Sequence, residues 1–256
     1  MAAGLIPARL SSTRLDRKAL ALVGGLPLIH HVVVNAKRAR RLSRIVVATD
    51  DGEIARAAEA AGAEAILTAP DHPSGTDRVA AAVAALGLAD EILVNIQGDE
   101  PEIAPSTIDA VAALLENDAT LDMSTAAAPL ATSEDWKSPH RVKVVCDDFG
   151  RALYFSRSPI PYRRAGAGEC SDEEWLARGT VLGHIGIYGY RRSSLTALVG
   201  LPPAALETIE KLEQLRALAA GMRIGVARVA SSPAGIDTAD DLEAFRRRYE
   251  SRSQSR

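Results

Sequence analysis

The 256-residue sequence is poor in several features that mark particular classes of protein. It has only two cysteines, Cys146 and Cys170, which are too few for a disulfide framework or a zinc site and suit a reducing compartment. Aromatic residues make up 4%, so a base-stacking platform for single-stranded nucleic acid is not expected. The net charge of −3 argues against a general polyanion binder, which would be basic. We therefore expect no nucleic-acid partner.

Long apolar runs are also missing. None reaches the length needed to cross a bilayer, and the N-terminus shows no basic-then-apolar signal region. We therefore expect no membrane association and a cytoplasmic protein. The composition that remains, 47% hydrophobic and 25% charged, is ordinary for a globular protein with a buried core. The length fits one large α/β domain or a domain with a sizeable insert.

Over the first half of the chain, short apolar runs alternate with Ala-rich segments of helical period. The expected strands are 2–6, 44–48, 64–67 and 91–96, and the expected helices are 26–40, 51–61 and 76–86. This alternation predicts a mostly parallel sheet that is flanked by helices on both faces. A ligand site is then expected beyond the carboxyl ends of the strands, where loops 7–18, 71–77 and 97–102 converge.

The second half changes character and predicts an α+β region. The pattern predicts a hairpin of strands 142–146 and 152–156, a polar loop over 163–180, a strand over 182–190, helices around 192–199 and 204–220, a strand over 224–229 and a helix over 238–249. On this basis residues 1–130 and 221–250 form the sheet domain and 131–220 an inserted region. The polar tail, 251–256, is expected to be disordered.

The loop that leaves the first strand, residues 7–18, carries spaced cations between small hydroxyl side chains. Its cations are Arg9, Arg14, Arg17 and Lys18. Such a loop suits a triphosphate, through bidentate arginine contacts, a lysine point charge and free backbone N–H groups. By composition alone, a solvated basic loop explains it equally well. The loop is not a Walker loop, since GxxxxGK[ST] is absent, and GxGxxG is absent too.

Two aspartates far apart in the sequence are candidate metal ligands. Asp99 follows a predicted strand beside Gly98, where a ligand can approach, although for a lone Gly-Asp pair a polar turn that closes a strand is the better explanation. Near the other end of the chain, Thr238 and Asp241 form a capping pattern for the last helix, and this leaves Asp237 spare. The expected sheet order brings Asp99 near the basic loop, which favours a metal site formed with Asp237.

Four further features carry alternatives that the sequence leaves open. Ser74, Gly75 and Thr76 offer hydroxyl and backbone groups to a base or ribose, although helix capping is the better explanation of Thr76 alone. A lone histidine such as His184 is more often structural than catalytic, and Arg157 is either a solvated charge or an anchor for an acidic substrate. An apolar stripe at helical spacing is either core or a dimer seam. Its members are Leu206, Ile209, Leu212 and Leu215.

Taken together, these segments resemble the 3-deoxy-manno-octulosonate (Kdo) cytidylyltransferases, the CMP-Kdo synthetase family. The resembling segments run in order over nearly the whole chain: IPARLSSTRL, IVVATDD, DHPSGTDR, NIQGDEP, VKVV, GRALYFSRSPIPY, GHIGIYGYR, LETIEKLEQLRAL and GIDTADDLE. The resemblance implies a Rossmann-like nucleotidyltransferase sheet with a smaller inserted region for dimerisation and sugar binding. It also implies that CTP and Kdo give CMP-Kdo and pyrophosphate, for lipopolysaccharide-type glycan synthesis, with Mg²⁺ and a homodimer.

Carried onto this chain residue by residue, the resemblance implies four groups of site residues. The CTP-binding residues are Arg9, Ser12, Arg14, Lys18, Ser74, Gly75 and Thr76. The metal ligands are Asp99 and Asp237. The catalytic residues are Lys18, Arg14 and Asp99. The sugar-acid contacts are Gln97, Arg157, His184, Tyr188, Glu213 and Gln214.

The chain departs from the family pattern at two places. Asp16 and Arg17 precede the loop lysine, where the family usually has Pro-Gly, and Gly183 precedes His184, where a basic residue is common. If Gly183 removes a cation from the sugar site, the alternative acceptor is a related ulosonic or amino-ulosonic acid. Another alternative is a catalytically silent nucleotide-binding protein of the same fold. The joint presence of Lys18, Asp99 and Asp237 disfavours it, because such a protein needs no metal site.

Overall fold

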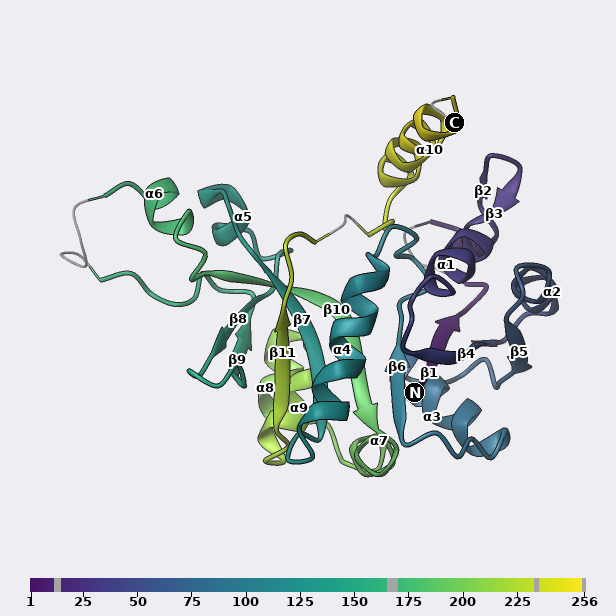
Figure 1. Ribbon diagram of the computed structural model, residues 1–256, viewed down its shortest axis with the longest axis horizontal. Coiled ribbons are helices and arrows are strands. Elements are labelled where there is room, and N and C mark those ends of the chain that lie inside the picture. The colour runs from purple at the N-terminus through teal and green to yellow at the C-terminus, as the bar shows by residue number, and fades with distance from the viewer. Residues whose placement is uncertain (12–14, 165–169, 233–234, 255–256) are drawn as a thin grey trace. The chain divides into compact units, whose positions relative to one another are not determined.

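The computed structural model describes residues 1–11, 15–164, 170–232 and 235–254 (Figure 1). The chain divides into two compact units, of which the first comprises 1–112 with 233–256 and the second comprises 113–232. Among the described residues, no helix is both long and apolar enough to cross a membrane.

The first unit is a parallel sheet in the order β6-β1-β4-β5. Its strands are β1 (Ala2–Ala8), β4 (Leu42–Thr49), β5 (Glu64–Leu67) and β6 (Ile92–Asn95). β1 pairs in parallel with β4 on one side and with β6 on the other. Leu5 and Ile6 point to opposite faces of β1 and are both fully buried, as they must be in a sheet that helices cover on both sides. The predicted parallel sheet is confirmed.

The helices of the first unit were predicted, with one of them shorter than expected, apart from the 3₁₀ turn over 18–20 and the helix over 105–117. They are the 3₁₀ turn η1 (Lys18–Leu20), α1 (Leu28–Ala36), α2 (Gly52–Ala60), α3 (Gly75–Ala85) and α10 (Ala239–Gln254), while α4 (Pro105–Asn117) crosses into the second unit. The helix expected over 26–40 is shorter because Gly24 and Gly25, at φ 56° and 81°, turn a small hairpin before it. That hairpin pairs β2 (Leu22–Val23) with β3 (Leu26–Pro27).

Side-chain caps fix where the helices near the expected ligand site begin. Asp51 accepts hydrogen bonds from the backbone N–H groups of Glu53 and Ile54 and so caps α2. At α3 the cap is Ser74, whose Oγ accepts from the N–H of Asp77. The prediction that Thr76 is the cap is wrong, because the extended Ser74 precedes the helix and Thr76 is buried in its first turn.

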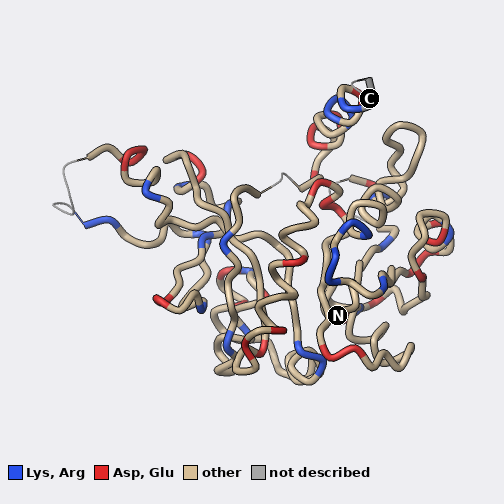
Figure 2. Tube along the Cα trace, in the orientation of Figure 1, with Lys and Arg blue, Asp and Glu red and all other residues tan. Residues whose placement is uncertain are grey.

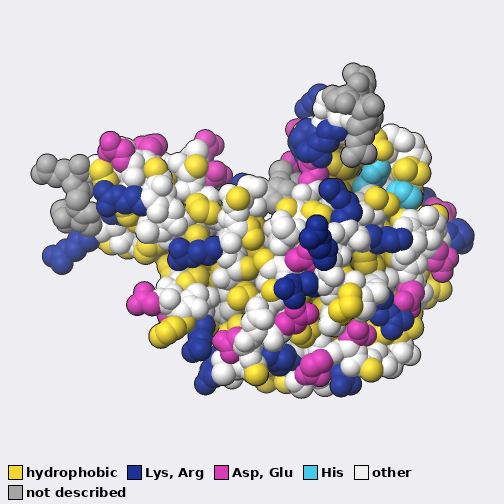
Figure 3. Space-filling view, in the orientation of Figure 1, with side chains coloured by type: hydrophobic (Ala, Val, Ile, Leu, Met, Phe, Trp, Pro, Cys, Tyr) yellow, Lys and Arg dark blue, Asp and Glu magenta, His cyan; other side chains and the backbone are white. Residues whose placement is uncertain are grey.

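α10 packs its apolar side against the start of the chain. Leu242 and Phe245 join Val23 and Leu28 in one buried cluster, and the Tyr249 ring lies edge-on to that of His31. Figure 2 shows acidic residues at the start of α10 and basic residues further along, a distribution that complements the helix dipole. On the face drawn in Figure 3, basic and acidic side chains are interspersed.

The second unit combines helices with a mixed sheet, which agrees with the predicted α+β region, although no strand was predicted over 123–129. β7 (Met123–Pro129) pairs in parallel with β11 (Ile224–Arg228) and antiparallel with β10 (Leu182–Arg191). β8 (Lys143–Cys146) pairs antiparallel with β10 and with β9 (Ala152–Ser156). The predicted turn between β8 and β9 is confirmed. Asp147 accepts there from the N–H groups of Phe149 and Arg151.

The helix expected over 204–220 is broken. α8 (Ala205–Glu210) and α9 (Gln214–Ala219) are separated at Lys211, which adopts a left-handed conformation with φ 54°. The predicted stripe divides accordingly: Leu212 and Leu215 are buried, whereas Leu206 and Ile209 remain 45% and 76% exposed. α7 (Arg192–Val199) forms where it was predicted.

Two further expectations are wrong. Within the segment expected to be a polar loop, α6 (Asp172–Leu176) forms, because Ser171 and Glu174 make a capping box and Leu176 is buried in a cluster with Trp136 of α5 (Ser133–Lys137). The tail expected to be disordered continues α10 as far as Gln254, and residues 255–256 lie outside the described part of the chain.

Candidate active site

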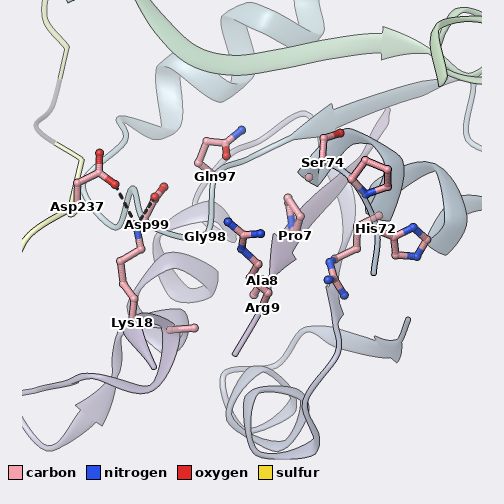
Figure 4. Close-up of a pocket in the computed structure, with 14 residues that line it drawn as sticks. Pro7, Ala8, Arg9, Lys18, His72, Ser74, Gln97, Gly98, Asp99 and Asp237 are labelled. Carbon is pink, nitrogen blue, oxygen red and sulfur yellow. Dashed lines mark hydrogen bonds and ion pairs between the residues drawn. The ribbon is translucent and has the colours of Figure 1, made fainter. Parts of the chain in front are cut away.

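A pocket of about 280 Å³ in the first unit is lined by residues from all three loops that were expected to converge (Figure 4). The size is near the lower end for small-molecule sites. The lining residues are Pro7, Ala8, Arg9, Lys18, Ala19, His72, Pro73, Ser74, Gly75, Arg78, Gln97, Gly98, Asp99 and Asp237. Polar and charged groups dominate this list, which suits a charged ligand. His72 and Arg78 were not singled out from the sequence, although both lie in or beside the DHPSGTDR segment.

Glycine is needed where these loops meet the end of β1. A Cβ at Gly98 would lie 2.9 Å from the carbonyl oxygen of Pro7, closer than such atoms can approach. A Cβ at Gly75 would lie 3.3 Å from the Pro7 ring. The loop after β6 and the start of α3 therefore approach β1 closely because these two positions lack side chains.

Lys18 joins the two aspartates that the sequence analysis selected. Its Nζ donates to Asp99 Oδ2 at 2.6 Å, to the carbonyl of Ile236 at 2.8 Å and to Asp237 Oδ1 at 3.2 Å (Figure 4). All three ammonium hydrogens thus have acceptors. The side chains are partly accessible, with Lys18 16%, Asp99 31% and Asp237 43% exposed, so a ligand in the pocket can reach them. Residues 81 and 219 positions away from Lys18 therefore meet at one point.

These contacts also test whether the aspartates fit a metal ion. Both carboxylates lie within hydrogen-bonding distance of one cationic nitrogen, so they are close enough together to share one cation. In the described ranges, no group of three or more His, Cys, Asp or Glu side chains is arranged to hold a metal. Asp99 and Asp237 therefore fit an ion such as Mg²⁺ that takes one or two protein carboxylates and completes its shell with water and phosphate oxygens.

Glu100 follows Asp99 directly in the chain, and its surroundings disfavour a negative charge on its carboxyl. Burial, and then the charges of Asp99 and Asp237, raise the pKa of the Glu100 carboxyl to about 7. Its Oε2 is buried without a hydrogen-bond partner in the described structure. Glu100 was not predicted as a site residue, because a polar turn at the end of a strand accounts for an acidic residue beside Asp99.

The structure also accounts for the first departure from the family pattern. Arg17, at the position where glycine is usual, adopts φ 49° and ψ 34°, the left-handed conformation that glycine adopts most easily. Its guanidinium pairs with Glu53 of α2. The loop therefore keeps a glycine-like backbone immediately before Lys18. Ser12 and Arg14, two predicted members of the triphosphate site, lie outside the described residues.

Of the predicted sugar-acid contacts, only Gln97 belongs to the first unit, where it lines the pocket. The other five belong to the second unit. The His184 ring contacts the rings of Phe155 and Tyr188, at centroid distances of 5.1 and 5.4 Å. Aromatic packing thus surrounds His184 on β10.

The tautomer of His184 follows from its partner. Thr125 Oγ1 lies 2.9 Å from His184 Nε2 and 2.7 Å from the carbonyl of Ile187. Since the single hydroxyl hydrogen donates to that carbonyl, the threonine oxygen accepts from Nε2–H, and Nδ1 keeps its lone pair. Burial lowers the pKa of His184 to about 3, so the ring is neutral at physiological pH.

Arg157 is held by backbone oxygens. Its guanidinium donates to the carbonyls of Glu210 at 2.7 Å, Pro139 at 2.9 Å and Lys211 at 3.4 Å. The Glu210 carboxylate in turn accepts from the backbone N–H of Arg157 at 2.9 Å and from Ser156 Oγ at 2.6 Å. Of the two interpretations of Arg157, a freely solvated charge is therefore wrong.

Two members of this cluster were missed in the sequence. One is Glu210, and the other is Lys143, whose fully buried ammonium donates to the carbonyls of Arg141 and Arg157 at 2.6 Å and of Ser138 at 2.8 Å. The sequence signal for Lys143 is its place among the valines of VKVV. A lysine in a short apolar strand is seldom buried unless its charge is paired.

Glu213 and Gln214 lie at the start of α9. Gln214 is buried, and its Nε2 has no hydrogen-bond partner among the described residues. A buried amide donor without an acceptor is costly, so this position suits a ligand oxygen.

The second departure from the family pattern has a packing explanation. A Cβ at Gly183 would lie 2.5 Å from a methyl carbon of Leu130. Because side chains alternate along a strand, a residue at 183 would point to the opposite face from His184. Glycine at 183 therefore leaves room for Leu130 in its apolar cluster. A basic side chain at 183 would not lie on the face of β10 that carries His184.

Comparison with known proteins agrees with these features. The family model for cytidylyltransferases matches residues 3–224. A 3-deoxy-manno-octulosonate cytidylyltransferase of Verminephrobacter eiseniae is 53% identical over 95% of this chain and 92% of its own length. One of Geobacter sulfurreducens is 48% identical over 93% of this chain and 95% of its own length.

Solved structures give the same result. A CMP:2-keto-3-deoxy-manno-octonic acid synthetase complexed with CTP is 37% identical, with a TM-score of 0.89 over 98% of this chain and 99% of that one. A 4-diphosphocytidyl-2C-methyl-D-erythritol synthase of Anaerococcus prevotii, 12% identical with a TM-score of 0.63 over 97% and 98% of the two chains, shares the fold. The chain belongs to the cytidylyltransferase family, with the 3-deoxy-manno-octulosonate cytidylyltransferases as its relatives at about half identity.

Proposed function

We propose that this protein transfers the cytidylyl group of CTP to Kdo and releases pyrophosphate. The observation that carries the proposal is the convergence of Lys18, Asp99 and Asp237 in a pocket that basic and hydroxyl residues also line. These three groups come from distant parts of the chain, and together they offer a cation for phosphate charge and two carboxylates for a metal ion. The relatives at about half identity are named for the same reaction.

The two sides of the pocket suit the two halves of CTP. Arg9 and Lys18, with Ser12 and Arg14 of the same loop, supply charge and donors for the triphosphate. Ser74 and Gly75 line the pocket and offer the start of α3 to the nucleoside, whereas the predicted Thr76 is buried and is not among the lining residues. The cavity takes in both loops, which supports one extended ligand in place of two separate ones.

A Mg²⁺ ion is proposed as the cofactor, held by Asp99 and Asp237. When bound, it would neutralise phosphate charge and lower the pKa of a coordinated hydroxyl. Two protein carboxylates with phosphate oxygens and water make a usual Mg²⁺ shell.

In the proposed reaction the anomeric hydroxyl of Kdo attacks the α-phosphorus of CTP in line with the departing pyrophosphate. The P–O bond to the β-phosphate breaks, and the hydroxyl proton leaves to solvent. The protein is asked mainly to align the two substrates and to offset the charge on the phosphates. Lys18, Arg9 and Arg14 carry the positive charge for this step, and Asp99 positions Lys18.

Kdo is proposed to bind through Gln97, Arg157, His184, Tyr188, Glu213 and Gln214. Neutral His184 suits a hydrogen bond to a sugar hydroxyl through its Nδ1 lone pair and is unsuited to binding the carboxylate as a cation. Arg157, already fixed by three carbonyls, keeps a full positive charge for that carboxylate. A related ulosonic acid was the alternative acceptor, and the packing of Gly183 against Leu130 removes the reason for preferring it.

A cytoplasmic homodimer is proposed as the working form. The proposal rests on the resemblance, because exposed apolar side chains occur on both units. Those of the second unit are the candidate contacts of its interface. They are Phe149 at 84%, Leu153 at 62%, Tyr162 at 85%, Leu206 at 45% and Ile209 at 76%.

The test is pyrophosphate release measured over a panel of nucleoside triphosphates and acidic sugars. CTP with Kdo should give the highest kcat/KM, and omission of the divalent cation should abolish turnover. Equal or higher activity with an amino-ulosonic acid would identify the alternative acceptor. Nucleotide binding without turnover on any acceptor would support the catalytically silent alternative.

A further inference from the structure

Asp50 connects two of the loops that line the pocket. It follows β4, and its side chain is 9% exposed. One carboxylate oxygen, Oδ1, accepts from the backbone N–H of Leu10 at 2.9 Å, directly after Arg9 in the basic loop. The other, Oδ2, accepts from Arg78 Nη2 at 3.2 Å.

Arg78 carries the connection into the nucleoside side. It lies in the first turn of α3, where its N–H donates to the carbonyl of Ser74 at 3.2 Å, and its side chain is 4% exposed. Its Nη1 donates to Thr68 Oγ1 at 2.6 Å, next to β5. Arg78 also lines the pocket. A continuous path of hydrogen bonds thus runs from Leu10 through Asp50 and Arg78 to the start of α3.

Stability alone is a poor explanation of this pair. Two charges that leave water for a protein interior lose solvation, and a well-packed hydrophobic pair of similar size is often equally stable. An ion pair differs from a hydrophobic pair because its hydrogen bonds are directional. They fix the relative position of the groups that they join. Here those groups are two ligand-binding loops.

We infer that Asp50 and Arg78 are positioning residues that couple the triphosphate half of the site to the nucleoside half. The inference rests on the proposed assignment of those halves to CTP. The pair holds the Arg9 loop and the Ser74 turn at the spacing of one nucleotide, so that binding of either half does not have to bring the other into place. Preorganisation of this kind acts on the whole ligand and leaves each fragment of it largely unaffected.

The test uses fragments of the nucleotide. Binding of CTP, cytidine and inorganic triphosphate is measured separately by calorimetry or NMR titration, with Mg²⁺ and without sugar acid. The variants are the neutral pair Asp50→Asn/Arg78→Gln and the hydrophobic pair Asp50→Leu/Arg78→Met, because loss of one partner alone would leave a buried charge and risk unfolding. The control is Arg44→Gln/Glu64→Gln. It removes a different ion pair, which joins β4 to β5 and whose residues do not line the pocket.

Both double variants should bind CTP about tenfold more weakly or worse while binding of cytidine and of triphosphate stays at the wild-type level. The control should bind all three ligands as the wild type does. Wild-type CTP affinity in a folded double variant would overturn the inference. An equal loss for all three ligands would also overturn it, because that pattern describes a collapsed site.

Failure of the proposed site would look different. In the otherwise unchanged chain, Arg9→Ala should weaken triphosphate binding alone and Ser74→Ala should weaken cytidine binding alone. If neither does, the assignment of the pocket is wrong. If both do and the double variants still bind CTP normally, the pocket is right and the coupling is wrong.

Discussion

The pocket of the first unit and the Arg157 cluster of the second unit hold their charges in different ways. In the pocket, the Lys18 ammonium pairs with two partly exposed carboxylates. In the cluster, Arg157 and Lys143 donate to backbone carbonyls. Side-chain pairs in the pocket can exchange partners when a ligand enters, whereas carbonyls fixed by the fold cannot. The first arrangement suits a charged ligand that comes and goes with a metal, and the second suits a rigid contact to one acceptor.

The largest effect is expected from removal of a pocket charge. Asp99→Asn should reduce kcat by about a hundredfold or more, because one carboxylate that holds Lys18 and the proposed metal is lost from a preorganised site. Pyrophosphate release is the measurement, with circular dichroism to show that the fold persists. Asp148→Asn, in the exposed turn between β8 and β9, is the control and should behave as the wild type. Normal turnover by Asp99→Asn would remove the metal assignment.

Arg157→Lys tests the other half of the comparison. A lysine cannot reproduce a planar guanidinium that donates to three carbonyls at once, so the cation should lose its fixed position. The KM for Kdo should rise roughly tenfold, the loss expected for one hydrogen bond to a charged group, while the KM for CTP stays unchanged. Arg164→Lys, exposed on the nearby segment, is the matched control. A parallel rise in both KM values would show that Arg157 supports the structure at large.

The two regions also differ in how far the sequence predicts them. The pocket could be predicted because its residues follow strand ends, and parallel strands bring those ends together whatever their spacing in the chain. Lys18 and Asp99 were selected in this way, whereas Asp237 was selected because the capping pattern of the last helix leaves it spare. The Arg157 cluster depends on carbonyls, and a backbone oxygen has no signature in the sequence. Glu210 was missed because its role depends on two backbone features that the sequence does not reveal. These are the break of the helix at Lys211 and the backbone N–H of Arg157, which donates to the Glu210 carboxylate.

Fold prediction failed where tertiary contacts outweighed local pattern. The break at Lys211 divides one apolar stripe between core and surface, and no proline or glycine marks it. The last turns of α10 were assigned to disorder because they are polar, yet earlier turns of the same helix pack Phe245 into the core. Strands 64–67 and 152–156 were predicted at the residues where they form, because short apolar runs in them are bounded by turn residues.

The pH dependence of stability should reveal the buried state of His184. Its pKa falls from 6.5 to about 3 on folding, so the unfolded chain takes up a proton as the pH drops below 6.5 and the folded chain does not. The stability that neutral His184 provides is therefore present above pH 6.5 and is lost progressively toward pH 3. Between pH 6.5 and 4.5 the loss should reach roughly 2 kcal/mol. Thermal or urea unfolding of His184→Gln should show a flatter pH dependence in this range, whereas the exposed-site variant His140→Gln should not.

The smallest effect concerns the backbone of the pocket loop. Arg17 is held at φ 49°, a conformation that costs a residue with a side chain roughly 1 kcal/mol relative to glycine. Arg17→Gly removes this cost together with an exposed ion pair to Glu53 that contributes little. Since glycine also gives the unfolded chain more freedom, the free energy of unfolding should rise by only about 0.5 kcal/mol or stay level. Arg17→Ala, which loses the same ion pair and keeps the backbone cost, is the control and should be the less stable variant by urea denaturation. If the two variants are equally stable, the left-handed turn before Lys18 is not where this loop stores strain, and Arg17 contributes through its side chain instead.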